Sequence, residues 1–138
     1  MAVKYLTNYA DLSDIELYKG EERWYKFVYD FAVQGGTAAD TFNVCILPAC
    51  FISDAYIACE TNVAGSSSTI EVGTSGDTDG IIDQTAEAVF VPGACVPHNE
   101  TEGRIGWAED DAVIMTIGTA NLTAGKLHIW LKLKELGY

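Results

Sequence analysis

Apolar and polar residues alternate along much of the chain, most regularly in its last segment. Leu127, Ile129, Leu131 and Leu133 are each separated by one polar or amphipathic residue. Because successive side chains of a β-strand point to opposite faces of a sheet, this period of two is typical of a strand with one buried face. A helix would scatter the same four residues, since residues two apart lie about 200° apart around its axis. The segment Lys126–Lys134 is therefore predicted to be a strand.

A second alternating segment covers residues 23–33. The Gly35–Gly36 pair that follows predicts a turn, because glycine adopts backbone angles that other residues avoid. The next alternating segment, residues 41–46, ends before Pro48, so the two segments are predicted to form a hairpin. The side of the first segment that is predicted to face the core consists of Tyr25, Phe27, Tyr29, Phe31 and Val33.

The rest of the chain also reads as short strands and turns. Further strands are predicted at residues 50–61, around 70–72 and at 112–117, the last of these apolar enough to be covered on both faces. Glycine, proline and small residues predict connections at 64–68, 73–80, 91–106 and 118–125, and the segment 81–90 stays open between a helix and a crossover. The pattern predicts an all-β fold, a single β-sandwich or jelly roll of about seven to eight antiparallel strands.

The first part of the chain differs from the rest. Residues 1–22 are predicted to form an N-terminal arm, and residues 23–138 the β-sandwich domain. Ser13 and Glu16 match a capping box, which favours one short helix at residues 14–18. The apolar groups of the arm are expected to pack on the body or on a neighbouring subunit.

Composition and charge limit the partners. The chain has 138 residues, 49% of them hydrophobic, which suits one domain with one core. Its 8 basic and 20 acidic residues give a formal net charge of −12, which argues against nucleic-acid binding because phosphate neutralisation needs clustered cations. No run approaches the roughly 18 apolar residues of a membrane span, and no signal-peptide stretch is found, so neither a membrane partner nor standard secretion is expected.

The four cysteines are predicted to be free, mostly buried thiols. Cys45, Cys50, Cys59 and Cys95 are too few for a disulfide scaffold in a domain that can bury a core. Their gaps of 5, 9 and 36 residues do not suit a zinc site. Whether Cys45 and Cys59 lie within bonding distance depends on the strand order, which the sequence leaves open.

No catalytic set and no cofactor motif is found. His98 and His128 are expected to be ordinary surface residues, and the chain has no nucleophile elbow, phosphate loop or dinucleotide fingerprint. Asp77, Asp79 and Asp83 lie close together in a glycine-containing segment and could hold calcium. A solvated turn is the favoured interpretation, because the glutamate that would complete an EF-hand loop is missing.

Positive charge is confined to the two ends of the chain. Residues 27–125 carry one basic residue and 14 acidic residues. If the strands that contain Lys26 and Lys126–Lys134 are neighbours, they would form a mildly basic strip with Trp24 and Trp130. Such a strip is either a solvated sheet face or an assembly surface, since aromatic side chains are favoured at interfaces. The candidate assembly residues are Tyr5, Tyr9, Trp24, Lys26, Trp130 and Lys132.

Four segments resemble the small β-sandwich virion proteins of tailed bacteriophages. They are ILPAC at 46–50, FISDAYIACET at 51–61, NVAGSSSTIEVGTSGDTDGII at 62–82 and AGKLHIWLKLKEL at 124–136. The resemblance covers residues 23–136, and the family commonly has a glycine where Cys50 stands. It implies a non-enzymatic structural protein, a capsid decoration or cement protein with a jelly-roll body.

The resemblance also implies partners and a location. The chain would assemble as a homotrimer, bind the major capsid protein and lie on the capsid surface of the virion after assembly in the host cytoplasm. Reducing conditions there agree with free thiols. Two other functions remain open: a tail, baseplate, fibre or glycan-binding virion module with an aromatic site at Trp107 or Trp130, and a small β-barrel enzyme or ligand binder.

Overall fold

The computed structural model describes residues 4–18, 21–99, 106–107 and 111–135, and most of these residues lie in β-strands. The helical segments among them are one helical turn, α1 (Phe31–Gln34), and one 3-10 turn, η1 (Glu87–Val89). The all-β prediction is confirmed. The strands are β1 (Tyr5–Asp11), β2 (Glu22–Asp30), β3 (Thr41–Ile46), β4 (Cys50–Gly65), β5 (Thr69–Thr74), β6 (Asp77–Ala86), β7 (Cys95–Pro97), β8 (Gly106–Trp107), β9 (Ala112–Gly118) and β10 (Leu122–Lys134).

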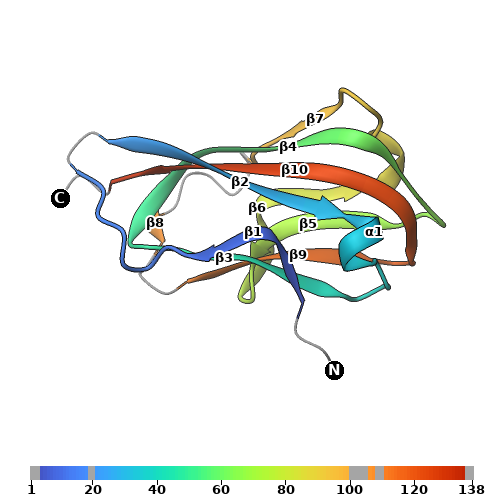
Figure 1. Ribbon diagram of the computed structural model, residues 1–138, viewed down its shortest axis with the longest axis horizontal. Helices are drawn as coiled ribbons and strands as arrows, with labels where there is room; N and C mark the ends of the chain where they lie inside the picture. Colours follow the sequence, from blue (N-terminus) through green and yellow to red (C-terminus); the bar gives the residue numbers. More distant parts are fainter. Residues whose placement is uncertain (1–3, 19–20, 100–105, 108–110, 136–138) are drawn as a thin grey trace.

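The strands belong to one continuous sheet that folds over into two layers. Their order is β6-β5-β9-β3-β1-β2-β10-β4-β7, with β8 also paired to β4. Strand β1 is the link, because it pairs antiparallel with β2 in one layer and parallel with β3 in the other (Figure 1). The predicted sandwich of seven to eight antiparallel strands is therefore not confirmed: ten strands form a mixed sheet with one parallel pair.

Hydrogen bonds also connect the far edges of the two layers. After β7, the backbone N–H of Asn99 donates to the carbonyl of Ile81 on β6 at 2.8 Å. The Asn99 side chain is buried and its Nδ2 donates to the carbonyl of Asp79 at 3.0 Å. The sheet is therefore nearly closed around the core, since β6 and β7 are its two ends.

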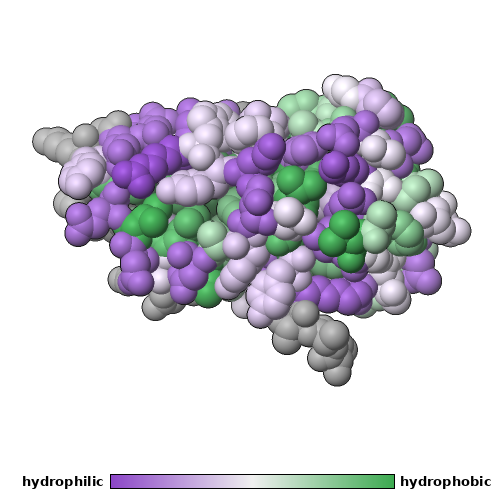
Figure 2. All heavy atoms as spheres, in the orientation of Figure 1, coloured by the Kyte–Doolittle hydropathy of each residue, from purple (hydrophilic) through white to green (hydrophobic). Residues whose placement is uncertain are grey.

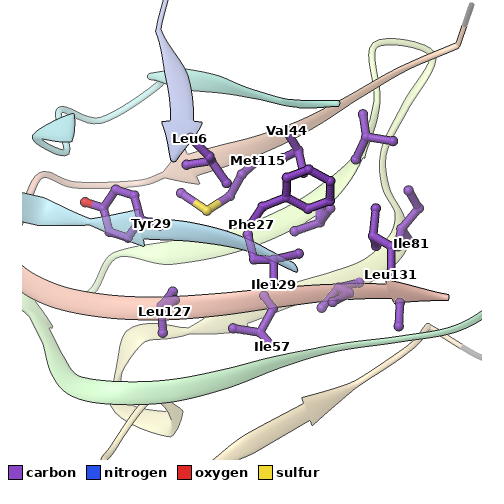
Figure 3. Packing of buried hydrophobic residues seen from close by; sticks show 14 of the residues in the cluster. Leu6, Phe27, Tyr29, Val44, Ile57, Ile81, Met115, Leu127, Ile129 and Leu131 are labelled. Atoms are coloured by element: carbon purple, nitrogen blue, oxygen red, sulfur yellow. The ribbon is translucent and has the colours of Figure 1, made fainter. Parts of the chain in front are cut away.

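Strand β10 lies at the centre of its layer. Residues Lys126–Lys134 pair antiparallel with β2 on one side, and β10 pairs with β4 along most of its length on the other. The predicted period of two is confirmed, because Leu127, Ile129, Leu131 and Leu133 are all buried. Figure 3 shows Leu127, Ile129 and Leu131 in the core, together with Val44 of β3 and Met115 of β9 from the other layer.

The strand predicted at residues 23–33 is shorter in the structure, because residues 31–34 form a helical turn. Phe27 and Tyr29 are buried as expected, but the strand ends at Asp30 and α1 follows. The Asp30 carboxylate accepts the Ala32 N–H at 3.0 Å, which caps this helical turn. Val33, predicted to face the core, is 71% exposed.

The predicted hairpin between β2 and β3 is wrong. Strand β2 pairs with β1 and β10, whereas β3 pairs with β1 and β9 in the other layer. The connection through α1 carries the chain across the end of the core. The tyrosine hydroxyl of Tyr29 donates to the carbonyl of Gly35 at 2.7 Å and holds this connection in place.

Three further segments differ in detail from the sequence prediction. The predicted loop at 73–80 is a tight hairpin in which Thr74 pairs with Asp77. The open segment 81–90 continues β6 to Ala86 and ends in η1. Strand β9 is buried on one face only, because Ile114 and Thr116 are half-buried.

The start of the chain takes part in the sheet. Leu6 of β1 and Leu12 are buried in the core, so this portion of the predicted arm packs on the body of its own chain. The helix predicted at 14–18 is absent. Its expected cap, Ser13, instead donates from both N–H and Oγ to the Asp11 carboxylate, at 3.0 and 2.6 Å.

We expect Ile129→Ala to destabilise the fold strongly. Ile129 is fully buried on β10, so truncation leaves a cavity between the layers and costs about 2–5 kcal/mol. Denaturant unfolding followed by circular dichroism measures this loss. Lys134→Ala on the same strand is the control, because Lys134 is exposed. Equal stability of the two variants would contradict the assigned core.

Candidate functional site

The outer side of the β2-β10-β4 layer brings four predicted assembly residues together. Trp130 lies opposite Lys26, and Lys132 lies opposite Trp24, in the register of β10 and β2. They point away from the core because they alternate with buried residues such as Ile129. The prediction that the two strands are neighbours is confirmed.

Tyr56 completes an aromatic cluster that the sequence analysis did not single out. It lies on β4 directly opposite Trp130. The ring centroids of Trp24 and Tyr56 are 5.5 Å apart, those of Trp24 and Trp130 6.2 Å, and those of Tyr56 and Trp130 6.1 Å. Tyr56 alternates along β4 with Ala55 and Ile57, which are buried, so the sequence pattern indicates that Tyr56 points outward. Only the pairing of β4 with β10 places it beside Trp130.

Two lysines lie over the tryptophan rings. Lys26 Nζ is 5.6 Å from the ring centroid of Trp130, and Lys132 Nζ is 5.4 Å from that of Trp24. Attraction between an ammonium group and the ring face holds the lysine stems along the aromatic surface. We call Trp24, Lys26, Tyr56, Trp130 and Lys132 the aromatic–lysine face.

Carboxylates of neighbouring strands neutralise much of this surface. Glu22 Oε2 lies 3.0 Å from Lys132 Nζ and accepts from Ser53 Oγ at 3.2 Å. The hydrogen bond from Lys132 is the main reason why the pKa of Glu22 is lowered. The strip is not the mildly basic one predicted from the sequence, because Glu22 of β2 and Glu60 of β4 lie beside Lys132 and Lys126.

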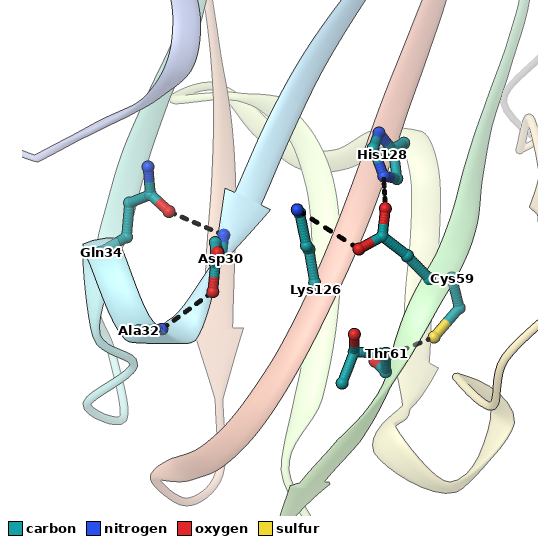
Figure 4. A network of polar contacts seen from close by, with 8 residues as sticks. Asp30, Ala32, Gln34, Cys59, Thr61, Lys126 and His128 are labelled. Carbon is teal, nitrogen blue, oxygen red and sulfur yellow. Dashed lines mark hydrogen bonds and ion pairs between the residues drawn. The ribbon is translucent and has the colours of Figure 1, made fainter.

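A second group of polar contacts continues along β10. Glu60 of β4 accepts from His128 Nε2 at 3.0 Å and pairs with Lys126 Nζ at 3.3 Å (Figure 4). These hydrogen bonds, that from His128 first, lower the pKa of Glu60. His128 therefore takes part in a network of polar contacts on the sheet surface.

Tyr5 and Tyr9 lie apart from the aromatic–lysine face. Their rings contact each other at 4.7 Å on β1. Strand β1 pairs with β2 at Thr7 and with β3 at Tyr5, Ala10 and Asp11, so both of its ends lie beside the other layer. Burial, followed by the nearby Tyr5 and Asp11, raises the pKa of Tyr9. We call Tyr5, Tyr9 and Asp11 the tyrosine patch.

An open hollow of about 260 Å³ lies beside the polar network, between α1 and the start of β10. Asp30, Phe31 and Lys126 line it. The Asp30 carboxylate caps α1, and Lys126 is paired to Glu60. The two charged groups of the hollow thus already have partners within the fold.

The acidic residues of β6 are not gathered into a metal-binding group in the described part of the chain. Among the residues the structure describes, no group of three or more His, Cys, Asp or Glu side chains is arranged to hold a metal ion. Burial and the charges of Asp79, Asp83 and Asp77 raise the pKa of nearby Glu71. The segment is thus a region of crowded negative charge.

All four cysteines are free thiols. Cys45, Cys50 and Cys59 are buried, and Cys95 is exposed. Burial raises the pKa of Cys50 to about 12 and also raises that of Cys45 and Cys59. The sequence left open whether Cys45 and Cys59 lie on neighbouring strands. They do not, because Cys45 is on β3 in one layer and Cys59 is on β4 in the other.

Trp107, the other tryptophan considered for saccharide binding, lies in β8 beside β4, and its side chain is outside the described residues. On the side of the molecule in Figure 2, hydrophobic residues form separate patches between hydrophilic ones. No helix in the described part of the chain is long and apolar enough to span a membrane.

The fold is similar to that of chains from two phage capsids. A chain from the capsid of Ralstonia phage GP4 matches with a TM-score of 0.68 and 15% identity, covering 92% of this chain and 96% of that one. A chain from the cyanophage Pam1 capsid asymmetric unit matches with a TM-score of 0.61 and 19% identity, covering 86% and 87%. No protein-family model and no curated protein matches the sequence. At these identities the likeness shows the fold.

We expect one rapidly reacting thiol per folded chain. Cys95 is exposed, whereas burial of the other three thiols blocks access and disfavours the reactive thiolate. Titration with a chromogenic disulfide reagent at neutral pH measures this, and denaturant should raise the number to four. Cys95→Ser should remove the rapid reaction. Two rapid thiols in the native protein would contradict the assigned burial.

We expect Lys132→Met to raise the pKa of Glu22 toward its ordinary value. The variant removes the main group that stabilises the carboxylate. Because the pKa of Glu22 is lowered in the fold, its stabilising effect exists at neutral pH and is lost as pH falls through that pKa. An NMR titration of the Glu22 carboxyl carbon measures the shift. Lys26→Met, whose lysine makes its aromatic contact with Trp130, is the control and should leave this pKa unchanged.

Proposed function

We propose that this chain is a non-enzymatic structural protein of a tailed-phage virion, which binds the capsid surface as a decoration or cement protein. The observation that carries the proposal is the end-to-end likeness to a capsid chain, covering 92% of this chain and 96% of that one. The four segments that resemble small virion proteins support it independently, because they were identified from sequence. The expected partners are further copies of the chain, as a homotrimer, and the major capsid protein.

The surface chemistry supports a protein partner. A formal charge of −12 repels other acidic surfaces, so a contact is favoured where the chain's own charges are balanced. The aromatic–lysine face meets this condition, because Glu22 is paired to Lys132 there. Trp24 is 43% exposed on this face, and aromatic side chains that become buried at the centre of a contact contribute much of its energy.

The same face bears on the glycan-binding alternative. Saccharide rings stack on uncovered aromatic faces, but ammonium groups of Lys26 and Lys132 lie over the rings of Trp130 and Trp24. This arrangement supports a protein partner over a sugar. If the test below shows no binding to capsids, the favoured function becomes a tail or receptor-binding role.

The test is to mix the purified protein with phage heads assembled without it and to sediment the heads. We expect co-sedimentation of the native chain, and at least a tenfold weaker association for Trp24→Ala, since the variant removes exposed aromatic area without touching the core. Val33→Ala is the matched control, because Val33 is an exposed apolar residue on α1, away from this face. Light scattering of the free protein measures its oligomeric state.

Failure of the native chain to sediment with heads, together with binding to a glycan array, would overturn the capsid role in favour of a receptor-binding module. Equal binding by the native chain and Trp24→Ala would remove the aromatic–lysine face from the contact.

A further inference from the structure

The outer surface carries two separate groups of contacting aromatic side chains. The aromatic–lysine face lies on the β2-β10-β4 layer, and the tyrosine patch lies on β1 where this strand follows β3 (Figure 1). Both are open to contact, since Trp24 is 43% and Tyr5 48% exposed. The structure thus divides the six candidate assembly residues into two surfaces at the bend between the layers.

Each patch carries one charge that has no counter-charge within the described chain. Lys26 contacts the Trp130 ring and lies within ion-pair distance of no described carboxylate. The Asp11 carboxylate accepts hydrogen bonds from Ser13 and likewise has no described cation beside it. The unmatched charges are opposite in sign, so the two patches complement each other.

Contacts between identical patches are disfavoured by the same charges. Two aromatic–lysine faces would bring two copies of Lys26 together, and two tyrosine patches would bring two copies of Asp11 together. Like charges at a contact cost energy, whereas a head-to-tail contact pairs Lys26 with Asp11 at each repeat. A head-to-tail contact closes into a ring when its rotation divides a full turn, as a trimer requires.

We propose that a second copy of this chain docks its tyrosine patch on the aromatic–lysine face, with Asp11 of one copy paired to Lys26 of the next and Tyr5 against Trp24. Repetition of this contact closes the homo-oligomer. The inference deepens the self-assembly part of the proposed function and rests on it, but it does not depend on capsid binding.

A mixing experiment tests the contact. One variant, Trp24→Ala with Lys26→Glu, disables the face, and another, Tyr5→Ala with Asp11→Asn, disables the patch without creating a reversed charge pair between the two variants. Each variant alone should be monomeric by light scattering. An equimolar mixture should form a dimer and nothing larger, because one intact face meets one intact patch. Circular dichroism and thermal unfolding check that both variants fold.

Two further variants separate charge from folding. Asp11→Asn keeps an acceptor for Ser13 and removes the charge, so we expect at least tenfold weaker assembly with unchanged thermal unfolding. Lys26→Asp combined with Asp11→Lys in one chain reverses the pair and should restore the native oligomer. Val33→Ala is again the control and should assemble as the native chain does.

Assembly by either disabled variant alone, or a mixture that stays monomeric, would overturn the proposed contact. A native chain that is monomeric yet sediments with heads would overturn the contact and leave the capsid role standing. A native ring that needs both patches but ignores heads would support the contact and overturn the capsid role.

Discussion

The antiparallel pairing of β10 on both of its sides is the constraint on which the rest of the structure depends. Because β10 joins β2 and β4 in fixed register, its alternation of apolar and polar residues is imposed on the whole layer. The inward residues, such as Ile129, form the core against the other layer. The outward residues, such as Trp130, become the centre of a surface made by three strands. A shift of one residue would exchange the two sets.

Pairing across strands also explains how an acidic protein can offer a surface for contact. The lysines of β10 alone would form a positive row, but Glu22 of β2 and Glu60 of β4 lie beside Lys132 and Lys126. Exposed ion pairs of this kind contribute little to folding stability. Their consequence is local: carboxylates balance Lys126 and Lys132, two of the lysines on this layer, on a body whose net charge is −12. On the same surface, the ammonium groups of Lys26 and Lys132 lie over the rings of Trp130 and Trp24.

Strand β1 gives the fold its second organising feature. It belongs to both layers, pairing with β2 around Thr7 and with β3 at Tyr5, Ala10 and Asp11. This position turns a short N-terminal segment into part of the core through Leu6, and places Tyr5 on the outside at the bend. A single chain can therefore present two different surfaces to two neighbours.

The sequence by itself determined the fold class, the strand at residues 126–134 and its inward residues, because a period of two is a local property of the chain. It also indicated free thiols and brought Trp24 and Trp130 forward as surface residues. Only the tertiary structure decided which strands are neighbours, since strand order depends on contacts between residues far apart in sequence. That order added Tyr56 to the cluster, balanced its lysines with Glu22, separated β2 from β3 and moved Val33 from the expected core to the surface.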